Sequence, residues 1–218
     1  MPELPEVETI CQTVAPKILN KSFVKITQRY NNLRHQVPVD LAKQIVNKKI
    51  NHVRRRAKYM LVDFADGLSL IMHFGLSGKI LFAASQDYVP KKHDHFLAEC
   101  EDGNLLIFND ARRFGSINYA YDINLSEHKL FAHLGPEPLS DNFDANYLYE
   151  VARNRKAPIK NFIMDHNIVV GVGNIYAAEA LFLSAILPTR QAAKVTKAEM
   201  VRLVDNIKIT LQKAIIAG

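Results

Sequence analysis

Cysteines and long apolar runs are both scarce in this chain of 218 residues, whose only cysteines are Cys11 and Cys100. Two cysteines are too few for a disulfide framework or for a four-cysteine zinc site. No run of about 18 apolar residues exists, so no segment is expected to span a membrane. The amino terminus is acidic and lacks an apolar core segment, which argues against a secretory signal. We therefore expect a protein of the reducing cytosol.

The composition is that of a globular protein, with 48% hydrophobic and 23% charged residues. Its length suits one large or two small domains. The net charge of +6 is concentrated in two segments, "NKKINHVRRRAKYM" at 47–60 and "ARNRKAPIK" at 152–160. Such clusters are typical of surfaces that bind polyanions, although a solubilising surface explains a single cluster equally well.

Two kinds of periodicity divide the chain. An amphipathic helix with Pro5 in its first turn is predicted over residues 5–20, because apolar residues recur there at spacings of three and four, at Val7, Ile10, Val14 and Ile18. From about 22 to 120 the period is two, as at Val24, Ile26, Gln28 and Tyr30 and at Met60, Val62 and Phe64. Asp-Gly pairs at 66–67 and 102–103 lie between apolar runs and indicate hairpins. We expect two packed antiparallel β layers, interrupted by one short helix near 39–47.

Helical periodicity replaces this alternation after "HLGPEPLSDNF" at 133–143, a proline-rich stretch that we interpret as an interdomain hinge. "TKAE" at 196–199 is a capping box that starts the last helix. This helix carries one broad apolar face, formed by Met200, Leu203, Val204, Ile207, Leu211 and Ile215.

A glycine turn precedes another helix in "VVGVGNIYAAEALF" at 169–182. Gly171 and Gly173 permit positive φ and close backbone approach, and Asn174 is the expected N-cap. The unpaired N–H groups at such a helix start can bind phosphate. A plain tight turn is an equally good interpretation, and the spacing matches neither a P-loop nor a dinucleotide fingerprint.

The first residues, "MPELPEVET", combine an early proline with several glutamates. Once Met1 is removed, Pro2 offers a secondary amine, which can attack a sugar C1′ and form an iminium that drives elimination. Glu3 is placed to supply and remove protons during that attack. Taken alone, however, Pro2, Glu3, Pro5 and Glu6 fit the start of a helix better.

Seven motifs together resemble the bacterial formamidopyrimidine-DNA glycosylases, which remove oxidised purines such as 8-oxoguanine. In chain order they are "PELPEVET", "RRRAKYML", "HFGLSGKI", "KHDHF", "DARRFGS", "LGPEPLS" and "GVGNIYAAEALF". The resemblance runs over essentially the whole chain. It implies an α+β fold, with an N-terminal antiparallel β-sandwich domain at 1–135, flanking helices, and a C-terminal all-helical helix-two-turn-helix domain at 136–218.

The resemblance also implies roles for individual residues. Pro2 matches the nucleophile that displaces the base and forms the Schiff base, Glu3 the proton donor, and Lys58 the lysine that contacts phosphate and assists β-elimination. The residues that match DNA-contacting positions, or that we group with them, are His93, Arg112, Arg155, Asn174, Glu6 and His73. His73 and Met72 also fit core or cleft positions.

A second group matches the wedge that fills the gap left by an extruded nucleotide: Leu76, Arg112 and Phe114. The family usually has methionine at the position of Leu76. His93 and His95 are a weak metal signal, because no cysteine or carboxylate cluster lies nearby in the sequence; we favour DNA contact or surface positions. No metal site or other cofactor is expected within these residues.

Family members usually continue for roughly fifty residues, through a segment that covers the flipped base to a four-cysteine zinc finger. Neither is found in this sequence, which we interpret as a fragment or a truncated product with uncertain activity; zinc is expected only in full-length members. A retained Met1 would turn the Pro2 nitrogen into an amide and remove the nucleophile.

The leading hypothesis is a glycosylase and AP lyase, a monomer that acts on double-stranded DNA with oxidised bases or abasic sites in the bacterial cytoplasm. One alternative is a catalytically silent DNA-binding derivative of the same fold. Another is an endonuclease VIII-like enzyme for oxidised pyrimidines, whose start usually reads PEGPE rather than the "PELPE" found here.

Overall fold

The computed structural model describes residues 2–30, 32–122 and 127–218. The chain divides into two compact units, one formed by Met1–Pro2 and Val7–Asn124 and the other by Glu3–Glu6 and Leu125–Gly218. The helices are α1 (Leu4–Ile18), α2 (Leu41–Ile45), α3 (Ala145–Ala152), α4 (Ile159–Met164), α5 (Asn174–Leu183), the 3₁₀ turn η1 (Ala192–Lys194) and α6 (Lys197–Ala217). The strands are β1 (Phe23–Gln28), β2 (Ile50–Arg56), β3 (Tyr59–Phe64), β4 (Leu68–His73), β5 (Lys79–Ala84), β6 (Asp94–Cys100), β7 (Asn104–Asn109) and β8 (Ser116–Tyr121).

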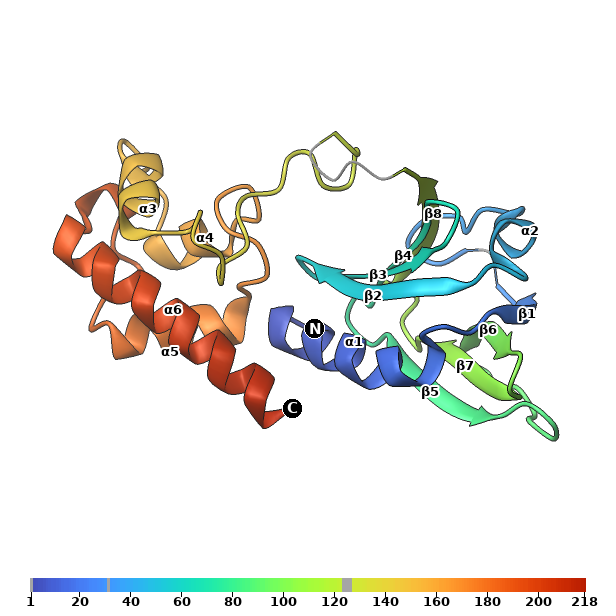
Figure 1. Cartoon of the computed structure of the whole chain (residues 1–218). Coiled ribbons are helices and arrows are strands. Elements are labelled where there is room, and N and C mark those ends of the chain that lie inside the picture. Colours follow the sequence, from blue (N-terminus) through green and yellow to red (C-terminus); the bar gives the residue numbers. More distant parts are fainter. Residues whose placement is uncertain (1, 31, 123–126) are drawn as a thin grey trace. The chain divides into compact units, whose positions relative to one another are not determined.

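The first unit is an antiparallel β-sandwich. Its strands form two sheets, in the orders β1-β6-β7-β5 and β2-β3-β4-β8 (Figure 1). One apolar core joins the inner faces of both sheets to helices α1 and α2. Helix α1 contributes Val7, Val14 and Ile18 to this core, as the sequence predicts, together with Cys11, whereas Ile10 of the predicted stripe is only partly buried against it. The predicted strands, the first helix and the short helix near residues 39–47 are confirmed.

The two Asp-Gly pairs form the predicted hairpins, between β3 and β4 and between β6 and β7. Gly67 and Gly103 have φ of +85° and +80°, which favours glycine at both turns. Asp66 and Asp102 each accept a hydrogen bond from the backbone N–H two residues later, the local contact that makes aspartate favourable before a turn.

Strand β1 departs from its predicted pattern at one end. The pairing of β1 with β6 shifts register between Phe23 and Lys25. Because a one-residue shift moves side chains to the other face, Phe23 is fully buried whereas Val24 is 44% exposed. The expectation that Val24 shares a face with Ile26 is therefore wrong, and Tyr30 lies beyond the end of the strand.

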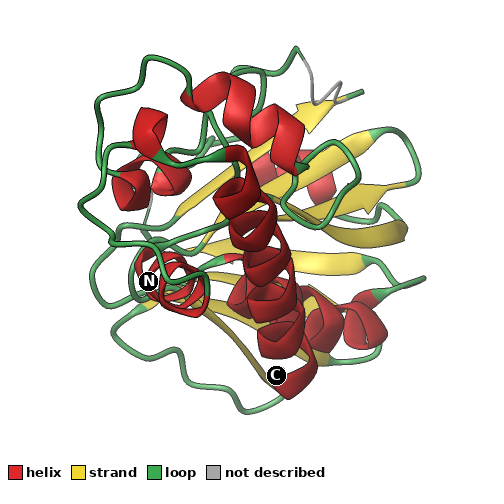
Figure 2. Cartoon of the chain, turned by 90° about the vertical axis from the view of Figure 1, so that its left-hand side faces the viewer, coloured by secondary structure: helices red, strands yellow, loops and turns green. Residues whose placement is uncertain are grey.

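The second unit is helical, and Figure 2 draws the helices of the chain in red. Its core is built largely by α3, α4, α5 and α6. Its longest helix, α6, begins with the predicted capping box, in which Thr196 and Glu199 each bind the other's backbone N–H. The predicted face of α6 from Met200 to Leu211 is buried, and the predicted α+β architecture is confirmed.

The segment after β8 packs on the helical unit. Gly135 N–H donates to the His166 carbonyl at 2.8 Å, and the Lys208 ammonium donates to the Ser140 carbonyl at 3.0 Å. The predicted domain boundary at residues 135–136 stays a prediction. No helix among the described residues is long and apolar enough to cross a membrane.

Candidate active site

The Glu3 carboxylate lies at the N-terminus of helix α5. Its Oε2 accepts a hydrogen bond from Gly173 N at 2.8 Å, and its Oε1 accepts one from Ile175 N at 3.0 Å. Tyr176 N is a third, longer donor at 3.5 Å. Only 3% of the Glu3 surface is exposed. The first N–H groups of a helix lack intrahelical partners and carry the positive end of its dipole, which makes this an electrostatically favourable place for a carboxylate.

The glycine turn makes room for Glu3. Gly173 lies at φ −118°, which any residue can adopt, but a Cβ there would collide with the Glu3 carboxylate and come within 2.6 Å of its Oε2. Gly171 has a φ of +80°, and a Cβ on it would lie 2.6 Å from the Leu4 Cβ. Leu4 N also donates to the Gly171 carbonyl at 3.1 Å. Both glycines are therefore required because Glu3 and Leu4 pack directly against the backbone of this turn.

One expectation about this turn is wrong. The N-cap residue of α5 is Gly173, and Asn174 is already the first helical residue. The N–H groups of Gly173 and Ile175, considered above for phosphate binding beside the alternative of a plain tight turn, bind the chain's own Glu3. Sequence reasoning could not find this arrangement because the partner precedes the turn by 170 positions. Asn174 itself is exposed, and its contact with DNA stays a prediction.

Glu6 and Tyr176 brace the same region. Glu6 Oε2 accepts from Glu3 N at 2.7 Å, and Glu6 Oε1 accepts from the Tyr176 hydroxyl at 2.5 Å. Burial, followed by the hydrogen bond to Glu6, raises the pKa of Tyr176 above its usual value. Glu6 therefore binds the chain's own backbone and Tyr176, a residue that the sequence did not single out.

Pro2 is partly buried, directly before Glu3. Met1, whose removal the predicted role of Pro2 as nucleophile needs, lies outside the described residues.

Lys58 lies in the tight turn between β2 and β3, where Arg56 pairs with Tyr59. Its neighbour Ala57 has a φ of +52°, which fixes the unusual turn that presents Lys58. His73, at the end of β4, faces this turn: its ring centroid is 4.8 Å from that of Tyr59. Lys58 and His73, both predicted site residues, therefore share one edge of the sandwich.

His73 is held neutral by its surroundings. Burial, together with the positive charges of Arg34 and Lys58, lowers its pKa from 6.5 to about 4. Its Nδ1 accepts a hydrogen bond from Gly75 N at 3.0 Å, so the proton of the neutral ring is on Nε2. Met72, for which a core or a cleft position was equally open, is fully buried in the core.

The three predicted wedge residues are exposed on two neighbouring loops. Leu76 is 37% and Phe114 44% exposed. The Arg112 guanidinium lies 5.0 Å from the centre of the Phe114 ring, in cation–π contact. The loops touch, since a Cβ on Gly75 would meet the Phe114 carbonyl and lie 2.6 Å from Gly115 N.

The two histidines of "KHDHF" differ in environment. His93 is partly buried, whereas His95 is 2% exposed and its Nε2 is 2.7 Å from the Asp110 carbonyl oxygen. The expectation of DNA contact or a surface position is therefore wrong for His95. Among the described residues, no group of three or more His, Cys, Asp or Glu side chains could hold a metal, so these residues do not fit a zinc site.

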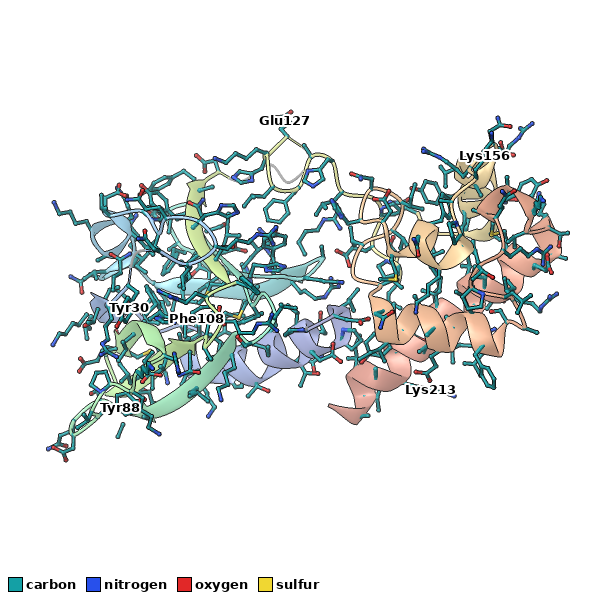
Figure 3. The ribbon with its side chains drawn as sticks, turned by 180° about the vertical axis from the view of Figure 1, so that it is seen from behind. Tyr30, Tyr88, Phe108, Glu127, Lys156 and Lys213 are labelled. Atoms are coloured by element: carbon teal, nitrogen blue, oxygen red, sulfur yellow. The ribbon has the colours of Figure 1, made fainter. Side chains whose placement is uncertain are left out.

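The two basic segments also differ. In the first, three cations form ion pairs within the sandwich: Lys48 with Asp66, Arg54 with Asp63, and Arg55 with Glu8. In the second, which follows α3, Arg153 pairs with Glu150 on the surface. Arg155 and Lys156 are exposed there, and Figure 3 labels Lys156 at the surface. The second segment is the more accessible to a polyanion.

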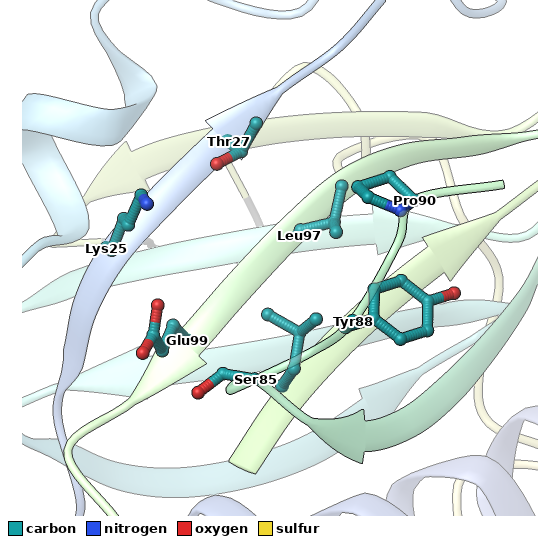
Figure 4. Close-up of a pocket in the computed structure, with 8 residues that line it drawn as sticks. Lys25, Thr27, Ser85, Tyr88, Pro90, Leu97 and Glu99 are labelled. Carbon is teal, nitrogen blue, oxygen red and sulfur yellow. The ribbon is translucent and has the colours of Figure 1, made fainter. Parts of the chain in front are cut away.

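A small pocket lies on the outer face of the β1-β6-β7-β5 sheet (Figure 4). Lys25 and Thr27 of β1 and Leu97 and Glu99 of β6 line it, together with Ser85, Tyr88, Pro90 and Leu105. It contains none of the predicted site residues.

Two family models match the chain. Residues 1–117 match the formamidopyrimidine-DNA glycosylase N-terminal domain, and residues 134–218 match the formamidopyrimidine-DNA glycosylase H2TH domain. A formamidopyrimidine-DNA glycosylase of Rickettsia bellii is 46% identical over 218 residues, which are all of this chain and 79% of the relative. One from Marinomonas is 44% identical over 219 residues, again covering 79% of the relative.

Solved structures agree. The Lactococcus lactis enzyme bound to DNA containing an AP site is 31% identical, with a TM-score of 0.91 over 98% of this chain and 82% of that one. The same enzyme with DNA containing FAPY-dG has a TM-score of 0.92, over 99% and 81%. By sequence and by fold, the chain belongs to the formamidopyrimidine-DNA glycosylase family.

Proposed function

We propose that this protein is a base-excision repair glycosylase and AP lyase that removes oxidised purines, such as 8-oxoguanine and formamidopyrimidines, from double-stranded DNA. One observation carries the proposal: the carboxylate next to Pro2 is buried and held by the N-terminus of α5. A carboxylate that only started a helix would need neither burial nor a glycine turn shaped around it.

In the proposed reaction, the lone pair of the Pro2 nitrogen attacks C1′ of the damaged nucleotide. The bond from C1′ to the base breaks, and the base leaves with a proton that Glu3 helps to deliver. The attacking nitrogen then loses its proton, and the C1′–O4′ bond breaks as O4′ takes up a proton, which opens the sugar ring and gives the iminium. The iminium acidifies C2′, whose proton is lost as the C3′–O bond to the 3′ phosphate breaks. Lys58 contacts phosphate during this elimination.

The remaining site residues act on the duplex in this proposal. Leu76, Arg112 and Phe114 fill the gap left by the flipped nucleotide, because unstacking a base costs a few kcal/mol. The phosphate and base contacts are assigned to His93, Arg112, Arg155, Asn174, Glu6 and His73. Affinity should therefore fall steeply as the salt concentration rises.

The Lactococcus lactis enzyme was solved with DNA containing an AP site or FAPY-dG, which supports damaged DNA as the partner. We infer a monomer that acts in the bacterial cytoplasm. Zinc enters the proposal only through the four-cysteine finger expected in full-length family members.

Borohydride trapping tests the proposal, because it reduces the iminium to a stable covalent bond. The purified chain is incubated with an 8-oxoguanine duplex and borohydride, beside the variants Pro2→Gly, Glu3→Gln and, as a control, Pro5→Ala. We expect an adduct with the wild type and Pro5→Ala, none with Pro2→Gly, and much less with Glu3→Gln.

Other outcomes identify the alternatives. DNA binding without any adduct would indicate a catalytically silent DNA-binding protein. An adduct with an oxidised-pyrimidine duplex but not with 8-oxoguanine would indicate an endonuclease VIII-like enzyme. An adduct that persists in Pro2→Gly would refute the assignment of the nucleophile.

A further inference from the structure

Asp110 is a fully buried carboxylate that binds both loops carrying the exposed wedge residues. Its Oδ1 accepts hydrogen bonds from the Ser77 hydroxyl and from Arg112 N, the latter at 3.2 Å. Its Oδ2 accepts one from Gly115 N at 2.8 Å. Ser77 Oγ in turn accepts a hydrogen bond from Arg112 N at 3.1 Å. One side chain thus bonds to the loop that holds Leu76 and to both ends of the loop that holds Arg112 and Phe114.

The backbone of Asp110 is itself fixed from the sandwich. Asp110 N donates to the His93 carbonyl at 3.0 Å, and the Asp110 carbonyl oxygen lies 2.7 Å from Nε2 of the buried His95. His95 is therefore a buried residue that holds the backbone of Asp110, and not the DNA contact that the sequence suggests. The carboxylate therefore projects from a rigid point.

Close packing locks the two loops further. A Cβ on Gly115 would lie 2.6 Å from Phe108 Cζ and 2.8 Å from the His73 carbonyl oxygen, so only glycine fits there. Between the stacked side chains of Arg112 and Phe114, Arg113 adopts a φ of +57°. Residues other than glycine hold this conformation only where the surrounding structure enforces it.

We propose that Asp110, with Ser77, is a positioning pair that holds Leu76, Arg112 and Phe114 as one preorganised wedge for insertion into the duplex. The inference rests on the proposed function. Arg112 N and Gly115 N can only donate, and they bind different oxygens of the Asp110 carboxylate, so both oxygens must accept and asparagine cannot replace it. A wedge ordered beforehand loses less conformational entropy when it enters the duplex than two loose loops do.

The variants Asp110→Asn and Ser77→Ala test this, with Ser69→Ala as the matched control. Ser69 is also buried and donates to a carboxylate, that of Asp63 at 2.6 Å, but it lies in β4 within the other sheet. Each variant is assayed by single-turnover base release from an 8-oxoguanine duplex and by cleavage of a preformed abasic site in single-stranded DNA, which needs no wedge.

We expect Asp110→Asn to slow duplex base release by about 10- to 100-fold, the scale of a misplacement of about 1 Å at a reacting centre. Ser77→Ala should slow it less, and both should cleave single-stranded abasic DNA at the wild-type rate. Ser69→Ala should match the wild type on both substrates. Unchanged duplex release in Asp110→Asn, or an equal loss on both substrates, would overturn the proposal. If Asp110→Asn does not fold, Ser77→Ala decides by the same criteria.

Amide hydrogen exchange gives a readout that needs no activity. In Asp110→Asn, two amides should exchange faster than in Ser69→Ala, that of Gly78, which donates to the Phe74 carbonyl at 2.8 Å, and that of Gly115, because Asp110 holds both loops. Faster exchange in only one of the two loops would refute the proposal that Asp110 holds both of them. A wild type inactive on every substrate would refute the proposed function instead, and the exchange comparison would still decide this inference.

Discussion

Substituting Gly173 by alanine should displace the Glu3 carboxylate while leaving the glycine turn itself unstrained. Alanine tolerates the φ of −118° at this position, so no backbone penalty arises. The new methyl group, however, would occupy the space of the Glu3 carboxylate, whose Oε2 would lie only 2.6 Å from the Cβ. The flexible glutamate side chain has to move, and it loses its bonds to Gly173 N and Ile175 N.

The expected size of the effect follows from those two bonds. Hydrogen bonds to charged groups stabilise by about 1.5–3 kcal/mol each, so the loss is about 3–6 kcal/mol before the displaced carboxylate regains water. If Glu3 is the proton donor, its displacement should also slow base release by about 10²- to 10⁴-fold, the usual contribution of general acid–base catalysis. Single-turnover base release from an 8-oxoguanine duplex measures the rate, and urea denaturation measures the free energy of unfolding.

Gly103→Ala is the control for general destabilisation. Gly103 has a φ of +80° and only Ser85 Oγ near its Cβ position, at 3.9 Å. Alanine there should cost about 1–2 kcal/mol through the backbone alone and leave base release unchanged. A wild-type rate in Gly173→Ala would refute the role of the anchored carboxylate, and equal losses in both variants would mean that stability, not Glu3, limits the reaction.

Four further predictions concern single groups. The pKa of His73 is about 4 in the folded state and 6.5 in the unfolded state, so the unfolded chain takes up the proton first as the pH falls. The free energy of unfolding should therefore be constant above pH 6.5 and decrease by at most about 3 kcal/mol as the pH falls toward 4. In His73→Asn, whose side-chain oxygen still accepts from Gly75 N, denaturation curves should lose this pH dependence. Protein whose Pro2 remains acylated by methionine, identified by intact mass, should bind DNA but give no borohydride adduct, since an amide nitrogen is not nucleophilic. Lys156→Ala should reduce the slope of log affinity against log salt by about 1 if Lys156 contacts a phosphate, as fluorescence anisotropy would show. Leu76→Ala should slow duplex base release by about tenfold, because the gap-filling side chain offsets part of the unstacking cost, whereas Leu76→Met should keep the rate.

The sequence predicted best where neighbours along the chain decide the structure. The shared core face of Met60, Val62 and Phe64 in β3, the Asp-Gly turns and the capping box at Thr196 all depend on residues within a few positions of one another, and all were found as expected. Leu61 of β3 is buried as well, so burial along this strand does not alternate. The expectations that proved wrong depend on residues that are far apart in the sequence. Val24 left its predicted face because pairing with the distant strand β6 shifts register beside it.

The candidate site shows the same division. Pro2, Glu3 and Lys58 were singled out by motif, but nothing local indicated that Glu3 would cap α5. The "DARRFGS" motif predicts roles for the exposed Arg112 and Phe114, but it gives no sign that Asp110 is buried between the two loops. An acidic residue before two arginines suggests an ion pair, yet this carboxylate bonds to backbone N–H groups and a serine hydroxyl. Contacts of that kind become visible only once the loops are folded.

A nucleophile at the very start of a chain poses a physical problem, because chain termini are usually poorly ordered. Attack at C1′ is fast only if the nitrogen is held within reach of the carbon, and loss of that order forfeits the proximity effect. Here the residues directly after Pro2 are tied down, by the bonds of Glu3 to α5 and of Leu4 N to Gly171. In the proposed reaction Glu3 therefore serves two purposes. It donates a proton, and it fixes the chain directly after Pro2, so that Pro2 is the only residue between the nitrogen and this fixed point that can still move. This explains why the glycine turn, far away in the sequence, is as much a part of the proposed site as the proline.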